Sequence, residues 1–203
     1  MRKFLFIVVL ILLAVTSAQL WMTKDRTSQQ NEISQPAVES KPDIGGAFTL
    51  TDTKGNIAHD IDFRGRIMLV YFGFTQCPEA CPLTLSMMSK TMAALGDKAN
   101  QVVPIFITVD PAHDTPAVLK DYLTNFDKRM VGLTGTDEHI KQVEDAYKVY
   151  AAKQEMNEKG QTTFDHSSYI YVMGKDGKFL TAIASTSQAQ DIVNVISPYL
   201  SQP

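Results

Sequence analysis

The only two cysteines of the chain, Cys77 and Cys81, lie in the segment YFGFTQCPEACPLTL, residues 71–85. Each is followed by a proline, and proline disfavours helical geometry in the residue before it. We therefore expect a helix to begin at Pro82, with Cys81 as its N-cap and an irregular turn leading in from Cys77. Both sulfurs then lie at the positive end of a helix, which stabilises thiolates and lowers their pKa values.

Several kinds of chemistry fit two thiols at this spacing. A purely structural disulfide would close too short a loop to stabilise the fold much, and such a polar, proline-bound turn is a poor place for buried filler. Redox exchange and metal binding stay open. A structural zinc site is disfavoured because the chain has no second pair of cysteines. Two thiolates with one imidazole suit a soft ion such as Cu(I).

The chain has four histidines that could supply this imidazole. His59 and His139 are expected to face solvent. His113, in VDPAHDTP, follows an apolar run, and His166, in FDHSSYIYV, directly precedes another. The residues alone do not decide between His113 and His166. Among the methionines, which can also bind Cu(I), Met88 and Met92 are expected in the core, and only Met87 and Met156 are candidates for a transient copper contact.

The elements around these residues predict an α/β fold. Two nearly continuous apolar runs, residues 66–74 and 101–109, indicate strands buried on both faces. The remaining patterns predict hairpins at 46–61 and 167–185, a short strand at 130–135, a polar loop at 153–164, and helices at 82–95, 115–126, 136–150 and 188–200. Alternating strands and helices imply a parallel central sheet, and ligands bind at the carboxyl ends of its strands. Cys77, Cys81, the loop 110–115 and the loop before Ser167 are expected at one such rim.

The amino-terminal segment and the composition limit the compartment and the partners. Arg2 and Lys3 precede an apolar run, as in an export signal. We favour an uncleaved anchor over residues 4–22 to cleavage after Ala18. The predicted organisation is a signal anchor or signal peptide at 1–22, a flexible tether at 23–41 and a folded domain at 42–203. A single amino-terminal span would hold that domain in the periplasm or outside the cell. With 44% hydrophobic residues and a net charge of -3, the chain is globular and no nucleic-acid binder.

These motifs together resemble the Sco/SenC family, thioredoxin-like copper chaperones for cytochrome c oxidase assembly. The resemblance rests on YFGFTQCPEACPLTL, FITVDPAHDTP, DHSSYIYVMGKDGKF and the tethered amino terminus, and it covers roughly residues 42–200. It implies a thioredoxin-like three-layer sandwich with a central mixed sheet and an amino-terminal β-hairpin. It also implies that Cys77, Cys81 and His166 bind copper, as Cu(I) or Cu(II).

The same resemblance implies a role. The protein would deliver copper to the dinuclear copper site of cytochrome c oxidase subunit II, and could reduce disulfides of that target. Its further partners would be a periplasmic thiol reductant or another copper chaperone. The chain departs from the family pattern at Gln76 and Glu79, where the family often has His and Asp, and in PAHD, where PERD is usual. His113 therefore adds an extra imidazole near the site, and Asp110 matches an acidic position thought to influence it.

Other functions are kept as alternatives. A periplasmic thiol-disulfide oxidoreductase usually has CxxC and a cis-proline opposite the cysteines, whereas this chain has CxxxC and no proline between Pro116 and Pro198. A peroxiredoxin-like peroxidase would have threonine three residues before the reactive cysteine, where Phe74 stands here. A sensor of redox state or copper cannot be distinguished from a delivery protein by sequence. We expect a metallochaperone with at most weak reductase activity.

Overall fold

A seven-stranded mixed sheet organises the part of the chain that the structure describes. The structure is a computed structural model, and it describes residues 43–154 and 163–200. In these ranges the strands are β1 (Thr49–Asp52), β2 (Ile57–His59), β3 (Ile67–Gly73), β4 (Val102–Thr108), β5 (Val131–Thr134), β6 (Ala151–Lys153), β7 (Phe164–His166), β8 (Tyr169–Met173) and β9 (Phe179–Ala184). The strand order is β2-β1-β5-β4-β3-β8-β9, and β6 and β7 form a separate two-stranded ribbon.

The direction of the strands follows from their connections. β3, β4 and β5 are joined through helices and run parallel, whereas the two outer pairs, β1–β2 and β8–β9, are antiparallel hairpins. Every residue of β3 and of β4 is buried, as their apolar runs predict. The parallel sheet expected from the alternation is thus limited to three central strands. The sheet as a whole is mixed, as the family resemblance implies.

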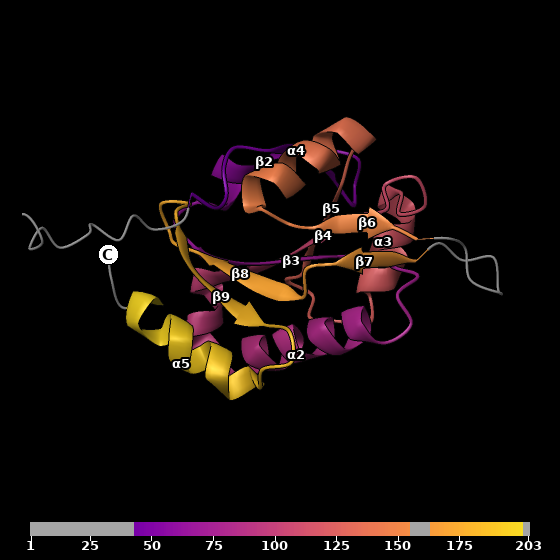
Figure 1. The fold of residues 1–203 in the computed structure, drawn as a ribbon. Helices are drawn as coiled ribbons and strands as arrows, with labels where there is room; N and C mark the ends of the chain where they lie inside the picture. Colours follow the sequence, from indigo (N-terminus) through magenta and orange to yellow (C-terminus); the bar gives the residue numbers. More distant parts are fainter. Residues whose placement is uncertain (1–42, 155–162, 201–203) are drawn as a thin grey trace, which may run out of the picture. The chain divides into compact units, whose positions relative to one another are not determined.

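Helices cover both faces of this sheet. They are α2 (Ala80–Ala94), α3 (Pro116–Leu123), α4 (Asp137–Tyr147) and α5 (Ala189–Leu200), with short 3-10 turns η1 (Asp60–Phe63) and η2 (Gly96–Gln101). Figure 1 shows α2 and α5 together below the sheet and α4 above it, and α3 packs against β5. None of these helices is long and apolar enough to cross a membrane. The predicted anchor and tether lie outside the described residues.

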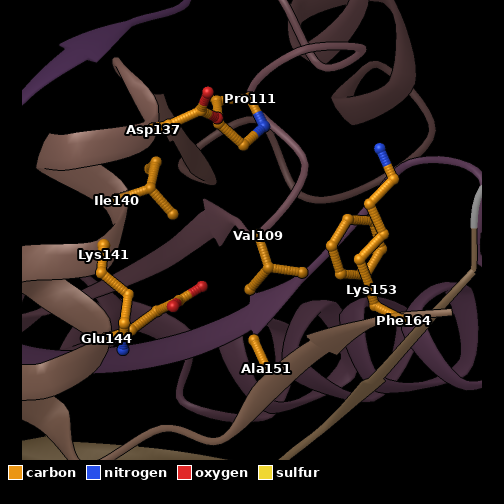
Figure 2. Close-up of a pocket in the computed structure, with 9 residues that line it drawn as sticks. All are labelled: Val109, Pro111, Asp137, Ile140, Lys141, Glu144, Ala151, Lys153 and Phe164. Carbon is orange, nitrogen blue, oxygen red and sulfur yellow. The ribbon is translucent and has the colours of Figure 1, made fainter.

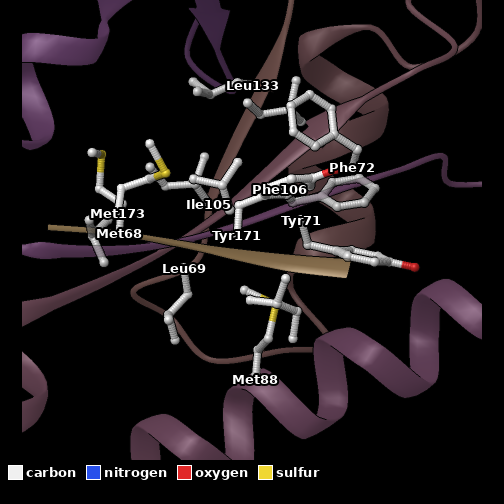
Figure 3. Close-up of a cluster of buried hydrophobic side chains, with 14 of the residues drawn as sticks. Met68, Leu69, Tyr71, Phe72, Met88, Ile105, Phe106, Leu133, Tyr171 and Met173 are labelled. Carbon is white, nitrogen blue, oxygen red and sulfur yellow. The ribbon is translucent and has the colours of Figure 1, made fainter. Parts of the chain in front are cut away.

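The core side chains alternate between the two faces of β3. Leu69 of β3 and Met88 of α2 both lie on the α2 side of the sheet, whereas Phe72 points to the opposite side (Figure 3). There Phe72 packs on Tyr147 of α4, with 5.4 Å between ring centroids. Both sides are therefore filled by large apolar side chains that hold β3 and its carboxyl end in place.

The helix caps lie where the local residue types favour them. Thr115 accepts a hydrogen bond from the N–H of Val118 and Pro116 is the first residue of α3. Thr136 caps α4 in the same way. Tyr150, in contrast, lies outside α4, although the predicted helix extends to residue 150. The helix ends at Tyr147, Lys148 adopts a left-handed conformation, and Tyr150 is exposed.

Two further predictions are corrected close to the cysteines. α2 begins at Ala80 rather than at Pro82, so Cys81 is inside the first turn instead of capping it. The carbonyl four residues before Pro82 belongs to Pro78, outside the helix, so the proline ring meets no helical carbonyl and its missing N–H is one that a first turn leaves unpaired. The predicted polar loop at 153–164 is flanked by strands: β6 and β7 pair, with Ala151 opposite His166.

Candidate metal centre

Cys81 lies between the first turn of α2 and the end of β3. Its side chain is fully buried and its sulfur accepts a hydrogen bond from the hydroxyl of Tyr71, at 3.8 Å. Gly73 makes this position accessible to the sulfur. A Cβ at residue 73 would lie 2.7 Å from Cys81 Sγ and 2.9 Å from a ring carbon of Phe106. A side chain at this end of the buried strand would therefore collide with the sulfur of Cys81, and glycine avoids the collision.

Cys77 is in the turn that leads into α2 and is only half-buried. The backbone N–H of Cys81 donates to its sulfur, at 3.4 Å. This N–H belongs to the first turn of the helix, whose amides have no partner within the helix. The sulfur of Cys77 thus takes the place of a capping side chain and lies at the positive end of α2.

The two cysteines have very different pKa values. The hydrogen bond from the thiol of Cys81 is the main cause that lowers the pKa of Cys77 to about 4, against the opposing effect of burial. The N–H groups of Cys81 and Glu79 donate to the same sulfur and act in the same direction. The same bond, together with burial, raises the pKa of Cys81 far above its ordinary value. Cys77 is therefore the thiolate and Cys81 the thiol that stabilises it.

His166, at the end of β7, completes the group. Its Nε2 lies 3.9 Å from Cys81 Sγ, across 85 residues of sequence. Its Nδ1 is 3.0 Å from the carbonyl oxygen of Ser167, which can only accept, so Nδ1 carries a proton. In the neutral ring the lone pair is then on Nε2, on the side of the sulfur. Tyr71 and Phe74 contact the ring edge-on and fix its orientation.

The loop after β4 locks the turn that carries Cys77. Asp114 is fully buried, and its carboxylate accepts hydrogen bonds from the N–H and hydroxyl of Thr75, at 2.9 and 2.5 Å, and from the hydroxyl of Thr108, at 2.6 Å. His113 Nδ1 lies 2.9 Å from the same carboxylate and its Nε2 lies 3.2 Å from the amide nitrogen of Gln76. Both ring nitrogens of His113 are therefore engaged by this lock and not by a cysteine.

Asp110 is buried beside this lock. Burial is the main cause that raises its pKa, and the neighbouring charge of Asp114 raises it further. Its backbone N–H is bound by the hydroxyl of Thr108. The structure places Asp110 in the loop that holds the cysteine turn, at the predicted rim.

A separate hollow of about 190 Å³ lies between α4 and the β6–β7 ribbon (Figure 2). It is lined by Glu144 and Lys141 of α4 and by Lys153 and Phe164 of the ribbon, with neither cysteine nor His166 among its lining residues. Glu144 is buried, which raises its pKa. Phe164 also packs on Phe74, at 5.3 Å between centroids. This hollow thus borders the ribbon that carries His166 but is not part of the dithiol site.

The three predicted ligands form an open group rather than a closed cage. Within residues 43–154 and 163–200, no set of three His, Cys, Asp or Glu side chains is arranged tightly enough to be a preformed metal-binding cluster. Cys77 and Cys81 are nevertheless in contact, and His166 contacts both.

Comparisons with known proteins decide the family. Residues 36–201 match the family model SCO1/SenC. The chain belongs to the SCO1/SenC family. Protein sco1 of Schizosaccharomyces pombe is 37% identical, over 98% of this chain and 78% of that protein. The SCO2-like protein RP587 of Rickettsia prowazekii is 38% identical, over 77% of each.

Solved structures of SCO1/SenC relatives have the same fold. Bradyrhizobium japonicum ScoI, solved with copper bound, is 38% identical, with a TM-score of 0.72 over 77% of this chain and 99% of that one. Yeast Sco1 with copper bound is 34% identical, with a TM-score of 0.73 over 80% and 91%. The predicted family and the thioredoxin-like α/β fold with a central mixed sheet are confirmed.

Sequence reasoning missed several residues of this SCO1/SenC site. Tyr71 and Gly73 stand in the apolar run before the cysteines, and the glycine is a signal that could have been used, since glycine inside a strand often marks a close approach. Asp114 stands in the PAHD motif, but the sequence gives it no role of its own. Its burial depends on contacts with Thr75, 39 residues away, which no local pattern reveals.

Proposed function

We propose that the chain binds copper through Cys77, Cys81 and His166 and delivers it during assembly of cytochrome c oxidase. The observation that carries the proposal is the contact between Cys81 Sγ and His166 Nε2, at 3.9 Å, beside the thiolate of Cys77. Two sulfurs and one imidazole are the soft donor set that Cu(I) prefers. The copper-bound relatives support the same cargo.

The geometry of the donors fits a shared ion. With metal–sulfur and metal–nitrogen bonds of about 2.3 and 2.05 Å, as in zinc proteins, a trigonal ion separates S and N by about 3.8 Å. The sulfur and nitrogen here are 3.9 Å apart. The lone pair of Nε2 is already on the correct side, because Nδ1 donates to Ser167. Binding therefore requires loss of the Cys81 proton and little movement of His166.

The test is Cu(I) uptake by the reduced full chain in competition with a Cu(I) chelator. We expect a single Cu(I) ion per chain. Cys77→Ser and Cys81→Ser should abolish uptake, and His166→Ala should weaken the affinity by at least about 10–100-fold, the loss that removal of a residue supporting a ligand already causes. His139→Ala, at an exposed position on α4, is the matched control and should leave the affinity unchanged. Tight copper retention by Cys77→Ser would reject this ligand set.

Delivery is proposed from the family. BsSco, which has the same fold, is a member of the Sco family of cytochrome c oxidase assembly proteins. We propose the dinuclear copper site of subunit II as the target, and an amino-terminal span that holds the domain on the outer side of the cytoplasmic membrane. A deletion strain should lose oxidase activity and regain it when copper is added. Loss that copper does not rescue would argue against delivery.

The unequal thiols favour thiol-disulfide exchange as a second function. The thiolate of Cys77 would attack a partner disulfide and release one partner thiolate. Cys81 would then pass its proton to that thiolate and attack the sulfur of Cys77, leaving an oxidised chain and a reduced partner. His166→Ala separates the two functions, since it should weaken copper binding while both sulfurs remain for exchange.

A further inference from the structure

A second hollow, of about 730 Å³, opens directly onto Cys77. Cys77 is one of its lining residues, whereas Cys81 and His166 are not. Cys81 is fully buried behind the turn. A molecule that enters through this hollow therefore meets the sulfur of Cys77 first. Its volume is within the range of sites that bind small molecules or short peptide segments.

The walls of this hollow form a groove along α2. One wall is the outer face of α2, with Leu83 and Met87, and the other is the connection between β9 and α5, residues 185–188, with the first residue of α5. Figure 1 shows that connection beside α2. Leu83 is 62% exposed although it is a large apolar side chain. Leu83 is not isolated, because Met87 and the sulfur of Cys77 line the same hollow.

The dimensions and charges of the groove indicate its occupant. From Ala80 to Lys90 the helix rises about 15 Å, the length of four or five residues of an extended chain. The charged side chains among its lining residues are Glu79, beside Cys77, and Lys90, ten residues along the helix from Ala80. Between them the α2 wall is mainly apolar, whereas residues 185–188 supply hydroxyl and amide groups. This combination fits an extended peptide with apolar side chains on one side.

We propose that this groove binds an extended segment of a partner protein in which apolar residues flank a cysteine, and presents that cysteine to Cys77. The inference rests on the proposed function, because it supplies the route by which a target thiol reaches the copper or the dithiol. In copper transfer, the incoming thiolate forms a bond to Cu(I), the bonds from Cys77 and Cys81 to copper break, and the proton of the incoming thiol ends on Cys81, which holds the one proton of the free pair.

The test measures recognition without copper. The full chain carrying Cys81→Ser, in detergent, is mixed with five-residue peptides whose central cysteine is activated as a mixed disulfide with thionitrobenzoate. The thiolate of Cys77 attacks the peptide sulfur, and thionitrobenzoate leaves as a coloured thiolate whose appearance gives the rate. One peptide has leucine and alanine around the cysteine, and the other has serine and glycine.

We expect the apolar peptide to react about tenfold faster, the effect of burying one large apolar side chain. Leu83→Ser should remove most of this preference. Ile57→Ser is the matched control, since Ile57 is 61% exposed but lies on β2, the opposite edge strand of the sheet. Both variants should react at the same rate with the free aromatic disulfide reagent, which needs no groove and reports an intact Cys77.

Two outcomes would overturn the proposal. The first is equal rates for the two peptides, or an equal effect of both substitutions. The second is self-association that Leu83→Ser abolishes in sedimentation experiments, which would make the groove an interface between copies of the chain. Failure of Cu(I) uptake with the peptide preference intact would reject only the copper function and leave the groove supported.

Discussion

Cys77 and Cys81 are four residues apart but have opposite chemical states. The half-buried sulfur of Cys77 receives hydrogen bonds from the thiol and the N–H of Cys81, whereas the sulfur of Cys81 is enclosed by Tyr71 and Gly73. Cys77 is thereby a thiolate that can react, and Cys81 keeps its proton. This asymmetry is the residue-scale basis of both proposed functions.

The asymmetry predicts how Cys77 responds to pH. With a pKa of about 4, Cys77 is a thiolate throughout the neutral range, so its alkylation rate should be nearly constant between about pH 6 and pH 8. An ordinary thiol would react roughly tenfold faster per pH unit over the same range. Cys81→Ala removes the main donor, so it should raise the pKa of Cys77 and restore a pH-dependent rate. The measurement is alkylation by iodoacetamide, followed by mass spectrometry.

A steep pH dependence of alkylation in the reduced wild-type chain would contradict the assigned thiolate. A flat profile that persists in Cys81→Ala would show that the helix end, and not the neighbouring thiol, sets the pKa of Cys77.

At the scale of elements, the site depends on a contact that the sequence did not reveal, although it placed the loop 110–115 at the rim of the site. Asp114 joins the loop after β4 to Thr75, two residues before Cys77, and to Thr108 at the end of β4. The cysteine turn is thus fixed at one end by α2 and at the other by a buried carboxylate. His113, considered from sequence as a rival ligand, is part of this lock.

We predict that Asp114→Asn destabilises the chain by about 2–4 kcal/mol, because the amide keeps the shape but cannot accept all these hydrogen bonds. The measurement is urea unfolding of the reduced chain. Asp121→Asn, at an exposed position of α3, is the control and should change the free energy of unfolding by less than about 0.5 kcal/mol. Asp114→Asn should also alter the pH profile of Cys77 alkylation. Equal stabilities of the two variants would show that the lock is unimportant.

Elements with local signals were predictable and those made by long-range pairing were not. The buried strands, the hairpin turns and the caps at Thr115 and Thr136 follow from runs and spacings that a short window contains. The β6–β7 ribbon does not, because its short strands have little pattern of their own and pair only across residues 154–163. The start of α2 lies two residues before the predicted one, because Pro82 is tolerated inside the first turn and does not have to be the first helical residue.

At the scale of the whole molecule, the fold brings distant residues to one rim. The order β4-β3-β8 places the turn after β3, the loop after β4 and the residues before β8 side by side. This is why the sequence could place Cys77, Cys81 and His166 at the same rim before any contact was known. It could not supply their orientations or the proton on each sulfur, because these depend on packing by Tyr71, Phe74 and the Ser167 carbonyl.

The dithiol also makes the stability of the whole domain depend on pH, and its contribution passes through a maximum as the pH rises. In the unfolded chain both thiols titrate near their ordinary value of 9.0. Between about pH 4 and that value, the unfolded chain binds two protons and the folded pair only one, so the contribution of the pair to stability grows as pH rises. Above that value the folded chain keeps the proton of Cys81 that the unfolded chain has lost, so the contribution declines.

We therefore predict that the reduced wild-type chain and the Cys77→Ser/Cys81→Ser double variant differ in a pH-dependent way. The stability of the wild type minus that of the variant should increase from about pH 5 to about pH 8 and fall again above about pH 9. Urea unfolding with a thiol reductant, repeated across pH, gives this difference. The raised pKa values of Asp110 and Glu144 affect both proteins alike and cancel. A difference that is flat, or that rises without a maximum, would mean that the two sulfurs do not share a proton in the folded state.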